Sequence, residues 1–364
     1  MKRRDFIAAA AATATATTAG TVVQAEPVAG TSVVAPSRVP VIDVHTHMFS
    51  QRWMQAAWAA HDPHFKLGRG AEEGSLIEDG ASMGRIVPPM LDYDLRLKAM
   101  DAAGVDIALI SLTAPNVYWG TRAESVAAAR GINDDFRDAA QHHDGRIRWM
   151  ASLPWQYPDE AIAELRRAKR GGAIGVCMLT NIRGTALTDA IYRPVWREIE
   201  AMGLPVFVHP TKPAINYIGQ DFSGLFNSIG FITDTTLCFA RIINDGFLDA
   251  FPKLNLIACH GGGYLPYIAA RLDIMWARAQ PHDSHRIARP PSTYLKQLWF
   301  DAILYDQPSL EFLITQVGAD RVLYGSDFPF RIGDMKGVRE RVDALPPEQR
   351  DAIRGLNHRK LFDL

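Results

Sequence analysis

The sequence lacks three features that would each point to a class of protein. It has only three cysteines in 364 residues, which excludes a disulfide-dense scaffold because at most one bridge could form. It has no surplus of one charge, since 39 basic residues face 40 acidic ones, and this balance excludes a basic nucleic-acid-binding protein. With 48% hydrophobic residues it is also not a disordered polypeptide. The composition therefore predicts a globular protein stabilised by a packed core.

Two motifs are also missing after the N-terminal region. No Gly-x-Gly-x-x-Gly follows the first predicted strand, which argues against a dinucleotide-binding fold. No stretch is long and apolar enough to span a bilayer. Because the charges are balanced and no span is present, we expect this chain to bind neither nucleic acid nor, once an N-terminal leader has directed its export, a membrane.

The first 25 residues are typical of a leader. Arg3 and Arg4 precede an Ala/Thr-rich tract, and Val23-Gln24-Ala25 places small residues at the spacing of a cleavage site. Residues 1–25 thus resemble a twin-arginine export signal, which implies that the mature protein is periplasmic. The alternative is a frayed N-terminus with two chance arginines. The segment 26–39, rich in small residues and proline, is predicted to be a linker.

From residue 40 onward, short apolar or β-branched runs alternate with longer segments of helical periodicity. This alternation is typical of parallel strands joined by right-handed helical crossovers. Eight repeats predict that residues 40–364 form a (β/α)8 TIM barrel. The predicted strands are 41–47, 106–112, 147–153, 174–178, 205–209, 254–260, 298–301 and 322–326. The predicted helices are 122–142, 159–169, 190–202, 234–250, 265–278, 308–317 and 347–361.

The repeat is interrupted after the first strand. About forty residues follow His47 before the next predicted helix begins, which is long for a connection in a barrel. This insertion, about 48–91, contains Trp53, Trp58 and Phe65. Large aromatic residues favour a packed lid or small subdomain beside the strand ends over a disordered surface loop.

Residue types that bind metals stand at the ends of four predicted strands, where barrel enzymes keep their chemistry. His45 and His47 are two residues apart and thus on one face of the first strand. His209 ends the fifth strand, His260 ends the sixth, and Asp327 follows the eighth. Each histidine alone is more often a hydrogen-bonded core residue. Together at one rim, they predict a site for zinc or a similar divalent ion with a position left for water.

The other histidines and the cysteines are interpreted as structural or solvated. The remaining histidines, among them His358 near the end of the last helix, end no strand. Cys177, Cys238 and Cys259 are expected to be buried free thiols. Because Cys259 neighbours His260, we expect it to face the helix layer, away from the metal.

These residues together resemble the amidohydrolase superfamily, and within it the α-amino-β-carboxymuconate-ε-semialdehyde decarboxylase group. The likeness covers about 41–361, and its most specific stretches surround His260 and Asp327. It implies that His45, His47, His209 and Asp327 ligate the metal, with His260 as the acid/base and Asp327 in a second, catalytic role. The fourth strand lacks the lysine that bridges two metals in binuclear members, so one ion, Zn²⁺, is expected.

The resemblance also predicts substrate-binding residues and a homodimer. In the group, an arginine eleven residues after the histidine of strand six reaches in from a neighbouring subunit, and Arg271 has that spacing. The alternative for Arg271 is a surface residue paired on its own helix. Val87 stands where the group has another arginine, and Arg85 is the candidate to replace it. Trp119 and Asn116 are predicted either to contact a planar substrate or to pack under the insertion.

The predicted function is that of a metal-dependent, non-oxidative decarboxylase, a carboxy-lyase, with metal-bound water and His260 as acid/base. Its substrate would be a small unsaturated or aromatic carboxylic acid. One alternative is a hydrolase of a lactone, ester or amide on the same site. Another is a non-catalytic periplasmic metal-binding protein. Release of CO2 distinguishes the first of these functions from the other two.

Overall fold

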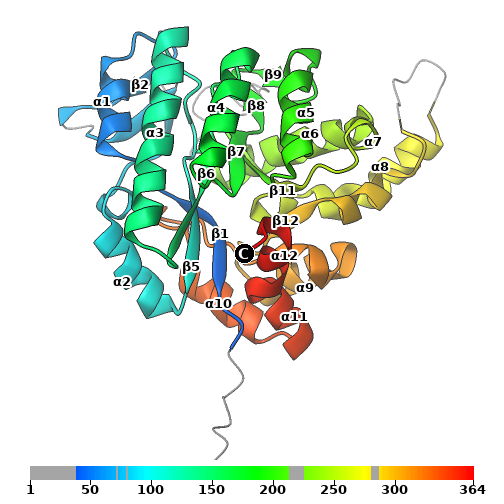
Figure 1. The fold of residues 1–364 in the computed structure, drawn as a ribbon. Helices are drawn as coiled ribbons and strands as arrows, with labels where there is room; N and C mark the ends of the chain where they lie inside the picture. Colours follow the sequence, from blue (N-terminus) through cyan, green and yellow to red (C-terminus); the bar gives the residue numbers. More distant parts are fainter. Residues whose placement is uncertain (1–37, 71–72, 79–80, 213–224, 280–286) are drawn as a thin grey trace, which may run out of the picture. The chain divides into compact units, whose positions relative to one another are not determined.

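The structure is a computed structural model that describes residues 38–70, 73–78, 81–212, 225–279 and 287–364 (Figure 1). The predicted leader and nearly all of the predicted linker lie outside the described residues, so both stay predictions. Residues Val39–Leu364 form one compact unit, which contains all the elements described below.

Eight parallel strands pair in the order in which they occur along the chain. They are β1 (Ile42–His47), β5 (Ile107–Ser111), β6 (Ile147–Ser152), β7 (Gly175–Leu179), β10 (Val206–His209), β11 (Leu256–Ala258), β12 (Trp299–Asp301) and β13 (Val322–Leu323). The sheet closes because the Val44 amide donates to the Tyr324 carbonyl at 3.0 Å and the His47 amide donates to the Phe328 carbonyl at 2.9 Å. The predicted (β/α)8 barrel is therefore confirmed.

Helices surround the strands (Figure 1). They are α2 (Tyr93–Ala103), α3 (Arg122–His142), α4 (Pro158–Arg170), α5 (Arg193–Met202), α6 (Phe231–Asn244), α7 (Phe247–Ala250), α8 (Leu265–Ala277), α9 (Gln307–Val317), α10 (Met335–Asp343), α11 (Pro347–Asp351) and α12 (Asn357–Phe362). The predicted bounds of α3 are those observed, because Thr121 and Glu124 form a capping box at its start. Among the described helices, none has the length and hydropathy to cross a bilayer.

Two predicted helices are interrupted, and α10 was not predicted. The expected helix 234–250 divides into α6 and α7 at Gly246, whose φ of 67° is left-handed. The expected helix 347–361 divides into α11, a π-helical turn (Ala352–Leu356) and α12. The unpredicted helix α10 follows β13 and precedes these elements.

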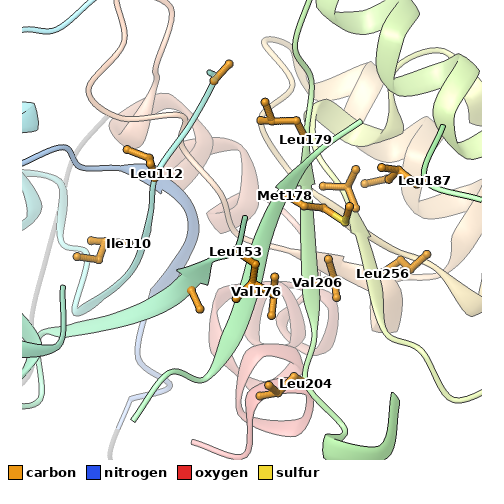
Figure 2. Packing of buried hydrophobic residues seen from close by; sticks show 14 of the residues in the cluster. Ile110, Leu112, Leu153, Val176, Met178, Leu179, Leu187, Leu204, Val206 and Leu256 are labelled. Carbon is orange, nitrogen blue, oxygen red and sulfur yellow. The ribbon is translucent and has the colours of Figure 1, made fainter. Parts of the chain in front are cut away.

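The core has an outer and an inner layer. The outer layer lies between strands and helices, and Figure 2 shows part of it, including Ile110, Val176 and Val206. The inner layer draws residues from all eight strands: Ile42, Val44, Leu109, Met150, Cys177, Phe207, Ile257, Trp299 and Leu323, with Cys259. Leu361 and Phe362 of α12 pack against this cluster, so α12 closes the amino end of the barrel.

The insertion after β1 is folded in the described residues. It contains α1 (Gln51–Ala59), a short 3-10 helix (Pro88–Met90) and an antiparallel sheet of β2 (Phe65–Leu67), β3 (Ser75–Glu78) and β4 (Ala81–Arg85). Asp62 ties it to the barrel rim by accepting hydrogen bonds from the Gly120 amide at 2.7 Å and from Arg183 at 2.8 Å. Arg183 belongs to the hairpin β8 (Asn181–Ile182) and β9 (Thr185–Ala186).

Candidate metal centre

A β-bulge directs both histidines of β1 into the barrel. Val44 belongs to the inner cluster, so strict alternation would turn Thr46 inward and His45 outward. The pairing between β1 and β5 shifts its register within this segment, and the extra residue lets both His45 and His47 face inward. The His45 ring centroid accordingly lies 4.8 Å from that of Phe207, which is part of the inner cluster.

Four buried side chains converge at the carboxyl ends of the strands. They are His45, His47, His209 and Asp327, and their ligand atoms all lie within 4.8 Å of one another. His45 Nε2 and His47 Nε2 lie 3.3 Å and 3.5 Å from Asp327 Oδ1. These three atoms have no hydrogen-bond partner among the described residues. Unpartnered buried polar atoms are costly, and three that face one point fit a divalent cation. The four residues thus form a divalent metal site.

Hydrogen bonds hold the second ring nitrogen of three imidazoles. His45 Nδ1 lies 2.7 Å from Asp301 Oδ2, and His47 Nδ1 lies 3.2 Å from Ser111 Oγ. His209 Nδ1 lies 2.7 Å from the Pro210 carbonyl. Such partners orient a ligating imidazole and fix its tautomer. No role for Asp301 was predicted, although its position as the last residue of β12 is a signal that could have identified it.

Electrostatics divide these residues into charged and neutral groups. Burial disfavours the charge of Asp327, but the positive charge of His45 and the close approach of the neighbouring imidazoles hold the pKa of Asp327 well below its usual value. Burial also opposes the charge of His45, yet Asp327 and Asp301 raise the pKa of His45 to about 10, so this imidazole would release a proton when a metal ion binds. Burial lowers the pKa of His47 to about 4 and that of His209 well below its usual value. His47 and His209 are therefore neutral at pH 7, the form in which imidazole binds a metal.

His260 joins this cluster through irregular backbone. The strand β11 ends at Ala258, two residues earlier than predicted, and His260 has a left-handed φ of 54°. Its Nε2 lies 3.6 Å from Asp327 Oδ2, and its Nδ1 has no partner among the described residues. A Cβ on the following Gly262 would lie 2.6 Å from the Phe300 ring, so glycine is required there. The tight turn thus places an imidazole beside the metal ligands.

The expected direction of Cys259 was wrong. Cys259 belongs to the inner cluster rather than to the helix layer, and its Sγ donates to the Val208 carbonyl at 3.2 Å. Ile257 and Cys259 follow strand alternation into the barrel, whereas His260 turns inward only through its left-handed backbone. Burial raises the pKa of the Cys259 thiol well above its usual value, so this residue is not a thiolate ligand.

A cavity of about 320 Å³ opens onto the cluster. His209 and Asp327 line it at the metal site. Most of its other walls are apolar, with residues from the insertion, from α6 and from the segment after β13: Leu76, Met83, Met90, Phe231 and Phe330. Arg85 of β4 and Arg331 after β13 line the same cavity. Such a cavity suits a small apolar molecule that carries anionic groups.

The other predicted substrate residues lie elsewhere. Trp119 is fully buried, stands 5.9 Å from the Trp53 ring centroid, and donates from Nε1 to the Asn116 carbonyl at 2.9 Å. Trp119 and Asn116 thus pack under the insertion, which was the second of the two predictions for them. Neither residue is among the described residues that line the cavity. Arg271 is exposed on α8. Its predicted contact with substrate therefore depends on a second subunit.

Comparisons with known proteins agree on one family. The amidohydrolase family model matches residues 42–364. The 2-amino-3-carboxymuconate-6-semialdehyde decarboxylase of Dictyostelium discoideum is 27% identical over 309 residues, covering 81% of this chain and 83% of that protein. The gamma-resorcylate decarboxylase of Rhizobium radiobacter is 28% identical over 332 residues, which cover 84% of this chain and 98% of that protein. A manganese-bound dihydroxybenzoic acid decarboxylase from a Polaromonas species has a TM-score of 0.73 at 23% identity, covering 89% of this chain and 97% of that one.

Proposed function

This chain belongs to the amidohydrolase family, and we propose that it is a metal-dependent, non-oxidative decarboxylase of a small aromatic or unsaturated carboxylic acid. The observation that carries this proposal is the convergence of His45 Nε2, His47 Nε2 and Asp327 Oδ1 beside a mainly apolar cavity that Asp327 and His209 line. The Dictyostelium and Rhizobium relatives each match more than four-fifths of this chain, and both are decarboxylases by name, which supports the same reaction.

The metal would be a single ion held by His45, His47, His209 and Asp327. When bound, the ion polarises an oxygen of the substrate and orients the carboxylate that leaves. Three imidazoles and one carboxylate are a donor set that zinc accepts readily, so we propose Zn²⁺. The manganese in the Polaromonas relative makes Mn²⁺ the competing assignment, and metal analysis of the purified protein decides between them.

His260 would supply the proton that the reaction needs. The proton goes to the substrate carbon that bears the carboxylate, and the electrons of the C–C bond then remain on the substrate as CO2 leaves. Asp327 Oδ2 lies 3.6 Å from His260 Nε2, close enough to orient this imidazole after a small adjustment. The apolar walls around Phe231 and Phe330 limit the access of water to the reacting carbon.

Arg85 and Arg331 favour a substrate with more than one anionic or strongly polar group. Both line the cavity that reaches the metal site, and Val87, which stands where the family arginine is expected, lines it too. Arg85 Nε donates to the Glu73 carbonyl at 2.8 Å, which holds the side chain on the insertion. We propose that Arg85 replaces the family arginine, because its remaining N–H groups can pair with a substrate anion.

We also propose a homodimer formed through α8. Tyr267, Ile274 and Met275 on this helix are 78%, 51% and 56% exposed, and large exposed apolar groups on one helix favour a protein interface. Arg271 lies on the same helix, so its role as a substrate contact depends on this dimer. Light scattering should give the mass of a dimer, and an active monomer would contradict the proposal.

The leader supports a further proposal about localisation. The arginine pair at residues 3 and 4 would direct export through the twin-arginine pathway, with removal of residues 1–25 in the periplasm. Replacing both Arg3 and Arg4 with lysine should retain the protein in the cytoplasm. Fractionation of cells that express the two forms measures this, and unchanged periplasmic recovery would rule it out.

Decarboxylation itself is tested with the purified, metal-loaded protein. A panel of aromatic and unsaturated acids is offered, with and without a second carboxylate, and CO2 and the decarboxylated product are measured. We expect product from at least one acid and its loss in His260→Ala. Lactones, esters or amides consumed without gas release would favour the hydrolase instead. Tight metal binding with no turnover of either panel would favour a binding protein.

A further inference from the structure

A fully buried arginine lies behind the first two metal ligands. Arg96 of α2 is 0% exposed and donates from its guanidinium to Thr46 Oγ1 and to the His47 carbonyl. Its Nε donates to Met48 Sδ at 2.9 Å. Among the described residues, the guanidinium donates to no carboxylate. A buried cation is costly without strong partners, and here most of its hydrogen bonds go to the end of a single strand, β1.

The same arginine also reaches the segment that follows β13. Its Cζ lies 5.1 Å from the centroid of the Phe328 ring, a cation–π contact. Thr46 Oγ1 in turn donates to the Phe328 carbonyl at 3.0 Å. Phe328 directly follows the metal ligand Asp327. Arg96, Thr46 and Phe328 therefore form one connected group, here called the seam clamp, that joins β1 to the Asp327 segment.

The seam clamp lies where the barrel closes through a short strand. The strand β13 has only two residues, and Thr46 meets Phe328 through an isolated bridge rather than a continuous ladder. Asp327 itself has a left-handed φ of 55°. By comparison, β10, which carries His209, pairs through four residues with β7 and three with β11. Backbone pairing on both sides thus fixes His209. Asp327 lies beyond the end of β13, where one backbone bond to β1, from the Asp327 amide to the His45 carbonyl at 2.7 Å, and side-chain contacts such as the seam clamp hold it.

We propose that Arg96 is a positioning residue that holds the seam clamp together and thereby sets the separation of His47 from Asp327. The inference rests on the proposed metal-dependent function. The proposal about Arg96 is based on the position of Thr46, which lies on the outer face of β1 between two histidines that face the interior. A change at Arg96 would leave every ligand in place and still loosen the geometry they present to the metal.

The test measures metal binding in the full chain. Arg96→Met and Thr46→Val remove the links of the clamp, whereas Thr46→Ser keeps the hydroxyl. The matched control is Arg339→Met, because Arg339 Nη1 donates at 2.7 Å to the Gly104 carbonyl at the end of the same helix α2 and touches no ligand strand. The readouts are the Kd for Zn²⁺ by competition and the visible spectrum of the Co²⁺ form.

Loss of residues that support metal ligands typically weakens binding, so we expect Arg96→Met and Thr46→Val to raise the Kd by about 10- to 100-fold and to change the Co²⁺ spectrum. Thr46→Ser and Arg339→Met should behave like the unmodified protein. If Arg96→Met does not fold, the Kd and the Co²⁺ spectrum of the nearly isosteric Thr46→Val variant decide the question. An unchanged Kd and spectrum in Thr46→Val, or an equal change in Arg339→Met, would overturn the proposal.

The ligand variant His47→Ala separates this inference from the function on which it rests. If His47→Ala binds Zn²⁺ as tightly as the unmodified protein, the metal assignment itself is wrong. If His47→Ala loses the metal while the clamp variants keep it, only the role of Arg96 is refuted.

Discussion

The barrel buries histidines in two settings, and the two differ in their partners rather than in their burial. At the carboxyl ends of the strands, His45 and His47 are fully buried, with Asp327 within 3.5 Å of both. In α12, which closes the opposite end, His358 is equally buried, but among the described residues its one hydrogen-bond partner is the Tyr324 carbonyl, to which its Nε2 donates at 3.1 Å. Carboxylate partners therefore distinguish a metal site from a structural histidine, and depth of burial does not.

The largest expected effect comes from removing the charge of Asp327. A bound metal contributes several kcal/mol to transition-state stabilisation, so we expect Asp327→Asn to lower decarboxylation by about 1,000-fold. Metal content and the rate of CO2 release measure the effect. His358→Gln, at the other end, should keep both values close to those of the unmodified protein. Retained metal in Asp327→Asn, or lost metal in His358→Gln, would break the comparison between the two ends.

Two glycines, one at each end of the barrel, have no room for a Cβ atom, so alanine variants of both allow the two ends to be compared. A Cβ at Gly325 would lie 2.8 Å from His45 Cβ and 3.0 Å from Asp301 Cβ. Because Asp301 supports a ligand, we expect Gly325→Ala to lower activity by about 10- to 100-fold. A Cβ at Gly175 would lie 2.9 Å from the Pro205 carbonyl oxygen, near Phe362, at the closed end.

The Gly175→Ala variant should therefore lose stability by about 1–3 kcal/mol, because overpacking strains a core, while its metal affinity is unchanged. Thermal unfolding and metal titration of both glycine variants give the two readouts. Equal loss of metal affinity in Gly175→Ala and Gly325→Ala would show that the two ends are not independent.

Because His358 is buried, we expect the stability of the fold to fall at acidic pH, independently of the metal. Burial lowers the pKa of His358 from 6.5 to about 3, so the folded state binds fewer protons than the unfolded state between these values. Stability from this group is complete above pH 6.5 and falls by about 1.4 kcal/mol per pH unit as the pH drops toward 3. His358→Gln should show a shallower slope in urea unfolding at the same pH values. Parallel slopes would contradict the assignment.

The smallest expected effect concerns the insertion, which covers only the metal end. Asp62→Ala removes the hydrogen bonds to the Gly120 amide and to Arg183 that tie the insertion to the barrel rim. Loss of about 1 kcal/mol of support should raise KM about fivefold with little change in kcat. His61→Ala, which removes only the exposed pair with Glu124, is the control and should leave KM unchanged. A fall in kcat alone would argue against a role for the insertion in binding.

Sequence patterns predicted the regular parts of the chain well. His209 ends β10 as expected, because Phe207 and His209 follow strand alternation into the barrel without interruption. The bounds of α3 were correct because its capping box is a local signal. The role of Asp301 was not predicted, because its contact with His45 joins residues 256 positions apart. The antiparallel sheet of the insertion was not predicted, because strands of three to five residues are too short to show a clear periodicity. The burial of Arg96 likewise depends on how α2 packs against β1.

The sequence alone determined the eightfold repeat and the chemical identity of the metal ligands, since periodicity and residue type are properties of the chain itself. Only the tertiary structure decided where the side chains point. The bulge in β1 turns His45 and His47 inward, and left-handed backbone brings His260 to the same point. A shift of one residue moves a strand's side chains to the opposite face, and the shift is set by contacts with neighbouring strands that no local pattern encodes.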